Sequence, residues 1–178
     1  MNVDDGLLDS PLACLDLSGA PITALVYEDG AAFERLLWSM IAHLRAQGRR
    51  LAGVAQINQL RAGQCRCDMI IEELSSGSRN PISQDRGSLA AGCRLDHNAL
   101  AALTIAVEQS LQHHFDFLIV NKFGNEEIEG RGFRAAIAMA VEKGIPVVIG
   151  VRARNLEDWR QFIGVDGAQD ALVKEYFV

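Results

Sequence analysis

Residues 116–132, an apolar run that ends in a crowd of charges, constrain the fold of this chain more than any other stretch. The run Phe-Leu-Ile-Val at 117–120 is continuously apolar, which is typical of a strand buried on both faces of a parallel sheet. Directly after it come an asparagine, a lysine, three glutamates, and an arginine between two glycines. Open α/β sheets place their ligand sites at the carboxyl ends of such strands. We therefore expect a strand over 116–121 and a binding site where it ends.

Strand and helix patterns alternate along the rest of the chain. Short apolar runs predict four parallel strands in one sheet, over 22–27, 51–57, 116–121 and 145–151. The residues expected to be buried in these strands are Val26, Val54, Ile119 and Val148. Apolar residues at helical spacing predict helices over 33–44, 97–113, 132–143 and 155–162. This alternation predicts a three-layer α/β/α domain with a mainly parallel sheet.

Two further features complete the predicted architecture. Cys67, Met69 and Ile71 alternate with Asp68, Ile70 and Glu72, and a short run follows around Ile82. Together these predict an antiparallel hairpin added to the core. Residues 1–20 show no clean period, so we expect an N-terminal arm there and a single α/β domain over 21–178.

The overall composition excludes some classes of partner. The 178 residues carry a net charge of −6, which argues against a nucleic-acid-binding or anionic-membrane surface. No apolar run approaches the roughly 20 residues that span a bilayer. The start of the chain is acidic where a signal peptide would be basic, so a cytoplasmic location is expected. Whether the protein forms a homo-oligomer stays open.

The turn after the first strand does not look like a phosphate-binding loop. Such loops need several glycines for close backbone approach and a lysine to meet the phosphate charge. The segment 27–33 has one glycine, no lysine and two carboxylates, Glu28 and Asp29. We expect an acidic turn that leads a helix, and no ATP hydrolysis that depends on it.

The loop after the central strand contains the candidate residues for binding an anion. Lys122 supplies a compact positive charge, and Arg131 can offer two parallel N–H groups to an oxyanion. Flanking glycines let the backbone approach a ligand, and the helix that follows offers free N–H groups. Arg94, which precedes the second predicted helix, is expected to close the other side of the site. The full set of expected ligand-binding residues is Arg94, Asn121, Lys122, Gly124, Glu127, Gly130, Arg131 and Gly132.

The glutamates of this loop permit two interpretations. Glu126, Glu127 and Glu129 have the chemistry of acid/base groups or magnesium ligands. Acidic residues also favour the start of a helix while facing water, and for the three together this second interpretation is favoured. The preceding Asn-Lys-Phe-Gly resembles the N-K-x-D signature with which GTPases read guanine, but Gly124 replaces the aspartate that reads the base.

The cysteines predict no metal site. Cys65 and Cys67 are spaced too tightly for the usual C-x-x-C knuckle, and no second pair exists. Cys67 and Cys93 both flank the irregular stretch 83–95, so they are hypothesised to approach each other, close enough for a shared metal or a disulfide. Buried, reduced cysteines are the simpler expectation.

Several motifs resemble a bacterial family of small proteins of unknown function. They are CDM (67–69), SQD (83–85), GCRLD (92–96), NKFG (121–124), EGRGFR (129–134) and GIPVVIGV (144–151). That family is similar to P-loop nucleoside-triphosphatases, so the resemblance implies a P-loop-NTPase-like fold over about residues 22–152. In those enzymes an acidic pair follows the central strand, where this chain has Asn121 and Lys122. Family members near molybdenum-uptake genes hint at an oxyanion or cofactor pathway.

The expected function follows from two differences between this chain and those enzymes: the turn after the first strand has no lysine, and Asn121 and Lys122 replace the acidic pair. We expect a P-loop-NTPase-like protein that binds a small anionic molecule, a nucleotide or a protein partner without Walker-type hydrolysis, with a nucleotide or magnesium as the cofactor to test. The alternative is a nucleotide-processing enzyme with a rearranged site, in which Lys122 and Arg131 bind phosphate and a glutamate handles magnesium or a proton. A structural partner of a transporter or metalloenzyme is a third alternative.

Overall fold

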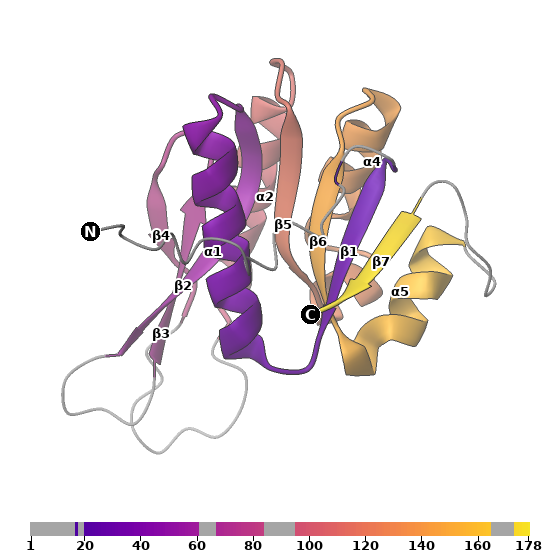
Figure 1. The fold of residues 1–178 in the computed structure, drawn as a ribbon. Coiled ribbons are helices and arrows are strands. Elements are labelled where there is room, and N and C mark those ends of the chain that lie inside the picture. Colours follow the sequence, from indigo (N-terminus) through magenta and orange to yellow (C-terminus); the bar gives the residue numbers. More distant parts are fainter. Residues whose placement is uncertain (1–16, 18–19, 61–66, 84–94, 165–172) are drawn as a thin grey trace, which may run out of the picture.

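The fold is a seven-stranded mixed sheet covered by helices on both faces (Figure 1). The computed structural model describes residues 17, 20–60, 67–83, 95–164 and 173–178. The strands are β1 (Ile22–Tyr27), β2 (Leu51–Leu60), β3 (Cys67–Glu73), β4 (Arg79–Pro81), β5 (Phe117–Phe123), β6 (Val147–Arg152) and β7 (Val173–Phe177). Their spatial order is β4-β3-β2-β5-β6-β1-β7. This is an α/β fold consistent with a P-loop-NTPase-like domain.

The four predicted parallel strands are confirmed, and so is the hairpin. β2, β5, β6 and β1 pair side by side in parallel, while β3 and β4 add an antiparallel edge next to β2. The four residues predicted at the strand centres are at most 1% exposed. β7 pairs in parallel with β1 and was not predicted. Its sequence, VKEYF, mixes charged and apolar residues because an edge strand is only half covered, so it carries no continuous apolar run.

The helices form the two outer layers. They are α1 (Gly30–Ala46), α2 (His97–Ser110), α3 (Asn125–Ile128), α4 (Arg134–Glu142) and α5 (Leu156–Ile163), with a 3₁₀ turn, η2 (Ala153–Asn155), before the last. α1 packs on one face of the sheet against alternate strand residues such as Leu25, Ile119 and Val148. α2, α4 and Trp159 of α5 pack on the opposite face (Figure 1). No helix in the part of the chain that the structure describes is long and apolar enough to cross a membrane.

The end of β5 differs from the prediction. The strand continues past the predicted end at Asn121 to Phe123, so Lys122 belongs to the strand rather than to the loop after it. In the pairing with β6 the register shifts between Val120 and Phe123. This shift marks a bulge at Asn121 and Lys122. The short helix α3 then begins at Asn125, which was not predicted, and α4 begins at Arg134 rather than at Gly132. Bulges of this kind redirect side chains at the rim of a sheet.

Gly150 on β6 makes this bulge possible. A Cβ at Gly150 would overlap the Asn121 carbonyl oxygen and the Phe33 ring, so only glycine fits between them. Phe33 in turn stacks on Tyr27, with ring centroids 4.1 Å apart. The ends of β1, β5 and β6 are therefore packed closely around a residue that has no side chain.

Candidate functional site

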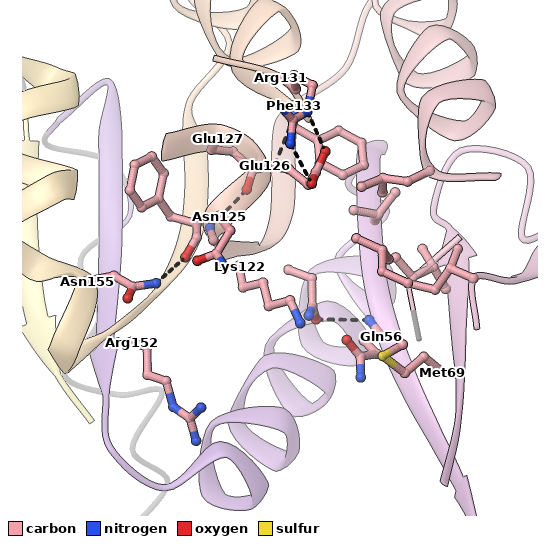
Figure 2. A pocket seen from close by; sticks show the side chains of 18 of the residues that line it. Gln56, Met69, Lys122, Asn125, Glu126, Glu127, Arg131, Phe133, Arg152 and Asn155 are labelled. Carbon is pink, nitrogen blue, oxygen red and sulfur yellow. Dashed lines mark hydrogen bonds and ion pairs between the residues drawn. The ribbon is translucent and has the colours of Figure 1, made fainter. Parts of the chain in front are cut away.

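A pocket of about 610 Å³ lies along the carboxyl ends of β1, β5 and β6 and reaches over β2 and β3 (Figure 2). This is the edge of the sheet at which the sequence predicted a site. Its apolar lining residues are Val54, Met69, Ile71, Ile82, Leu95, Leu100, Phe123 and Phe133. Its charged and polar lining residues include Lys122, Glu126, Glu127, Glu129, Arg131, Arg152 and Arg154. The volume suits a ligand of nucleotide size.

The pocket reaches down to the point where β2 and β5 stop pairing. The parallel ladder between these strands ends at Val54 and Val120. Two residues further along, the Gln56 backbone N–H donates to Asn121 Oδ1 at 2.9 Å. The Asn121 side chain, only 7% exposed, thus takes over a bond that the backbone of β5 no longer makes. The polar groups at the base of the pocket are held by the sheet itself.

Three exposed cations lie on the pocket wall at the strand ends. Lys122 comes from the bulge of β5, Arg152 ends β6, and Arg154 follows in the 3₁₀ turn. Arg152 and Arg154 both lower the pKa of Tyr27, but burial outweighs them and raises it. Among the described residues, none of the three cations has an ion pair or a side-chain hydrogen bond. Figure 2 shows Lys122 and Arg152 on the side of the pocket away from Arg131.

Arg131, by contrast, is held by carboxylates of its own loop. Its guanidinium pairs with Glu126, with Nε 3.0 Å from Oε2, and also with Glu129. His97, at the start of α2, lies 3.3 Å from the other oxygen of Glu126. Burial raises the Glu126 pKa, but the hydrogen bond and charge of Arg131 outweigh this and lower it. An anion that approaches Arg131 has to compete with two glutamates, which the sequence did not predict.

Glu127 does not face water, and the expectation that the three glutamates would do so is wrong for this residue. It is 4% exposed. Oε2 accepts the Gly124 N–H at 2.9 Å, and Oε1 accepts the Phe133 N–H at 3.1 Å. Burial raises the pKa of Glu127 despite these hydrogen bonds. Glu127 therefore joins the two ends of the 124–133 loop, and both of its carboxylate oxygens are already committed.

The turn after β1 is the acidic helix start that the sequence predicted. Asp29 caps α1, and its Oδ1 accepts the N–H groups of Ala31 at 2.8 Å and Ala32 at 3.2 Å. These are backbone donors that a phosphate-binding turn would offer to its ligand. A carboxylate of the chain already occupies the N-terminus of this helix.

The other predicted residues stand as follows. Asn121, Lys122, Gly124, Glu127 and Arg131 all line the pocket, while Gly130 and Gly132 flank Arg131 in left-handed conformations, with φ of 86° and 60°. Arg94 and Cys93, and with them the hypothesis of a close Cys67–Cys93 pair, lie outside the described residues. Within the described ranges no cluster of His, Cys, Asp or Glu side chains has the makings of a metal site.

Residues 22–175 match the model of a family described as "Protein of unknown function (DUF2478)". The chain belongs to this family. Among curated proteins it is similar to the Molybdenum import ATP-binding protein ModC 2 of Bradyrhizobium diazoefficiens, with 30% identity over 159 residues. The match covers 89% of this chain but only 18% of that much longer relative. This distant similarity suggests a relationship with P-loop NTPases. No solved structure matches the chain.

The two arginines at the end of β6 were not predicted from the sequence. Val-Arg-Ala-Arg at 151–154 has the same character as the end of β5, because basic residues directly follow a buried apolar run. Open α/β sheets place their ligand sites at the carboxyl ends of buried strands, and this rule predicts a role for the residues after β6 as well as for those after β5. This DUF2478 protein therefore has a basic region formed by two strand ends, whereas the prediction placed the cations on one loop.

Proposed function

We propose that this DUF2478 protein binds a small anionic ligand, a nucleotide or another phosphate-bearing molecule, at the carboxyl ends of β5 and β6. The observation that carries the proposal is the group of three pocket cations, Lys122, Arg152 and Arg154, for which the described part of the chain supplies no counter-ion. In a chain of net charge −6, cations without partners in a concave site are a feature that an anionic ligand would explain.

The same site differs from a Walker-type hydrolytic site. Asp29 accepts the backbone N–H groups at the start of α1, and the strand end that would supply an acidic pair has Asn121 and Lys122 instead. A triphosphate at the β1 turn would have to displace one carboxylate while lying beside a second, Glu28. We therefore propose binding without Walker-type hydrolysis.

The candidate residues keep distinct roles in this proposal. Lys122 and Arg152 provide the main charge, with Arg154 beside them. Asn121 and Gly124 form the base of the site, and Arg131 extends it once an anion displaces Glu126 or Glu129. Gly130, Gly132 and Glu127 shape the loop, and Arg94 stays a predicted contact.

Isothermal titration calorimetry at low salt tests the proposal, with pyrophosphate, ATP and molybdate as ligands. Molybdate is included because the curated relative is named as a molybdenum import protein. A lost charge-assisted contact costs about 1.5–3 kcal/mol, so Arg152→Ala should weaken binding by roughly tenfold to a hundredfold, and Lys122→Ala similarly. Arg35→Ala is the control, because it removes an exposed charge from α1, away from the pocket. Unchanged affinity in Arg152→Ala, or no binding of any anion at millimolar concentration, would contradict the proposal.

The alternative function is a nucleotide-processing enzyme with a rearranged site. One observation favours it: Glu126 and Glu129 line the same pocket as the cations, so carboxylates and phosphate-binding groups are within one cavity. Release of phosphate from ATP in the presence of magnesium, lost in Glu126→Gln but kept in Glu142→Gln on the exposed end of α4, would favour the enzyme.

A further inference from the structure

We infer that the ligand of this pocket is a phosphorylated heterocycle, whose ring lies between the apolar walls and is recognised by the side-chain amide of Asn121. The inference rests on the proposed function, because the phosphate is assigned to Lys122, Arg152 and Arg154. It adds the chemical class of the remainder of the ligand and its direction in the pocket.

The orientation of the Asn121 amide is set by the sheet. A backbone N–H is only a donor, so the Gln56 N–H at 2.9 Å requires the oxygen of Asn121, not its nitrogen, on that side. The two N–H donors of Nδ2 are therefore directed elsewhere. Within the described residues they have no hydrogen-bond acceptor, although the side chain is 93% buried and lines the pocket. Nδ2 is not among the buried side-chain atoms of the described residues that lack a partner, so it is open to the pocket, where a ligand atom can accept its hydrogen bonds.

The apolar wall is larger than a bare oxyanion needs. Ile71 and Ile82 from the hairpin side, Leu100 of α2 and Phe133 are each less than 8% exposed and all line the cavity. Phosphate or molybdate gains nothing from such a surface, whereas a flat ring with a carbonyl or ring nitrogen gains apolar contact and an acceptor for Asn121. A sugar phosphate would supply the charge but not the apolar surface.

The charges of the pocket give the ligand a direction. Lys122 and Arg152 lie on the side away from Glu126, Glu127 and Arg131 (Figure 2). Glu126 and Glu129 line the other end, where a phosphate would meet two carboxylates. Asn121 and Lys122 are neighbours on the β5 bulge, so the amide that contacts the ring and the first cation are adjacent. The phosphate therefore points to the ends of β5 and β6 and the ring to the hairpin side.

Calorimetry with AMP, GMP, UMP, ribose 5-phosphate and pyrophosphate tests the inference on the whole chain. At least one nucleotide should bind wild type about tenfold or more tightly than ribose 5-phosphate, because among these probes only the nucleotides carry a heterocyclic base. Asn121→Asp keeps the oxygen for Gln56 but removes both donors. It should lower the affinity for that nucleotide at least about tenfold more than the affinity for ribose 5-phosphate. Asn125→Asp, the same change of charge at another pocket residue, should affect both ligands equally.

The outcomes separate the inference from the proposed function. If pyrophosphate and ribose 5-phosphate bind as tightly as the nucleotides, and Arg152→Ala weakens all of them, the inference is overturned while the anion site stands. If no probe binds, both are overturned. The wild-type comparison needs no variant, so it decides the matter even if Asn121→Asp does not fold.

Discussion

The Glu127 carboxylate occupies the space that a side chain at Gly132 would need. A Cβ on Gly132 would overlap Oε1 of Glu127, and Gly132 also has a left-handed backbone with φ of 60°. The same carboxylate accepts the N–H groups of Gly124 and Phe133. The segment between these two residues carries Glu126, Glu129 and Arg131, so one buried acid and one missing side chain shape the acidic end of the pocket.

Substitution of Gly132 should be much more damaging than substitution of Gly130. Both have positive φ, for which an alanine costs about 1–2 kcal/mol. Only at Gly132 does the new methyl group displace the Glu127 carboxylate, because nothing lies within 4 Å of a Cβ on Gly130. Leaving buried N–H groups without acceptors should make Gly132→Ala less stable than Gly130→Ala by about 2 kcal/mol. Urea denaturation measures the difference, and equal destabilisation would contradict this account.

The contribution of Glu127 to stability should fall as the pH rises. Burial raises its pKa in the folded protein above the unfolded value of about 4.3. Between these two pKa values the folded state binds more protons than the unfolded state, so the free energy of unfolding decreases with pH. The contribution is complete below the unfolded pKa and is lost as the pH passes the folded one.

The variant Glu127→Gln isolates this effect. Since glutamine does not titrate, the stability of wild type relative to Glu127→Gln should shrink with rising pH, which denaturation at a series of pH values between about 4 and 8 would show. A relative stability that grows with pH would mean that the hydrogen bonds from Gly124 and Phe133 outweigh burial.

Gly30→Ala should leave ligand binding unchanged and should fold. Gly30 is the first residue of α1, its φ is not positive, and a Cβ there would meet no atom within 4 Å. Alanine at such a position should stabilise the protein by about 0.4–1 kcal/mol. A thermal melt and a nucleotide titration test both parts. Magnesium-dependent ATP turnover that is abolished in this variant would show that the turn does bind phosphate.

Asp29→Ala tests the same turn from the other side. The loss of a capping side chain should cost about 0.5–2 kcal/mol of stability. Asp29→Asn keeps an oxygen acceptor and should stay within a few tenths of wild type. Chemical denaturation of both variants gives the comparison. A stability gain in Asp29→Ala would show that the Asp29 side chain does not stabilise the start of α1.

Arg131→Ala should weaken anion binding less than Arg152→Ala does. Its charge alone would predict a roughly tenfold to hundredfold loss for Arg131→Ala, the same as for Arg152→Ala. Because Glu126 and Glu129 already hold the Arg131 guanidinium, an anion gains less there than at a cation without a carboxylate partner. Calorimetry with pyrophosphate on the two variants decides the order. A larger loss in Arg131→Ala would shift the site toward the 124–133 loop.

The sequence by itself determined the layers and the edge of the sheet where the pocket lies. The short, mainly apolar runs that begin at Ile22, Leu51, Phe117 and Val147 predict buried parallel strands because such strands are covered on both faces. The helical spacing of apolar residues in α1 predicts its buried stripe for the same local reason. The acidic cap at Asp29 follows equally from neighbouring residues. Each of these features depends on segments of fewer than about 20 residues.

Only the tertiary structure decided which of the charged residues are available to a ligand. Arg131 and Lys122 look alike in the sequence, but one is paired with two glutamates and the other has no carboxylate partner in the described chain. Arg152 joins Lys122 because β6 lies next to β5, and Glu127 is buried because its loop folds back to Phe133. Ion pairing and burial depend on distances between segments that are far apart in the chain, and a local pattern of residue types does not contain those distances.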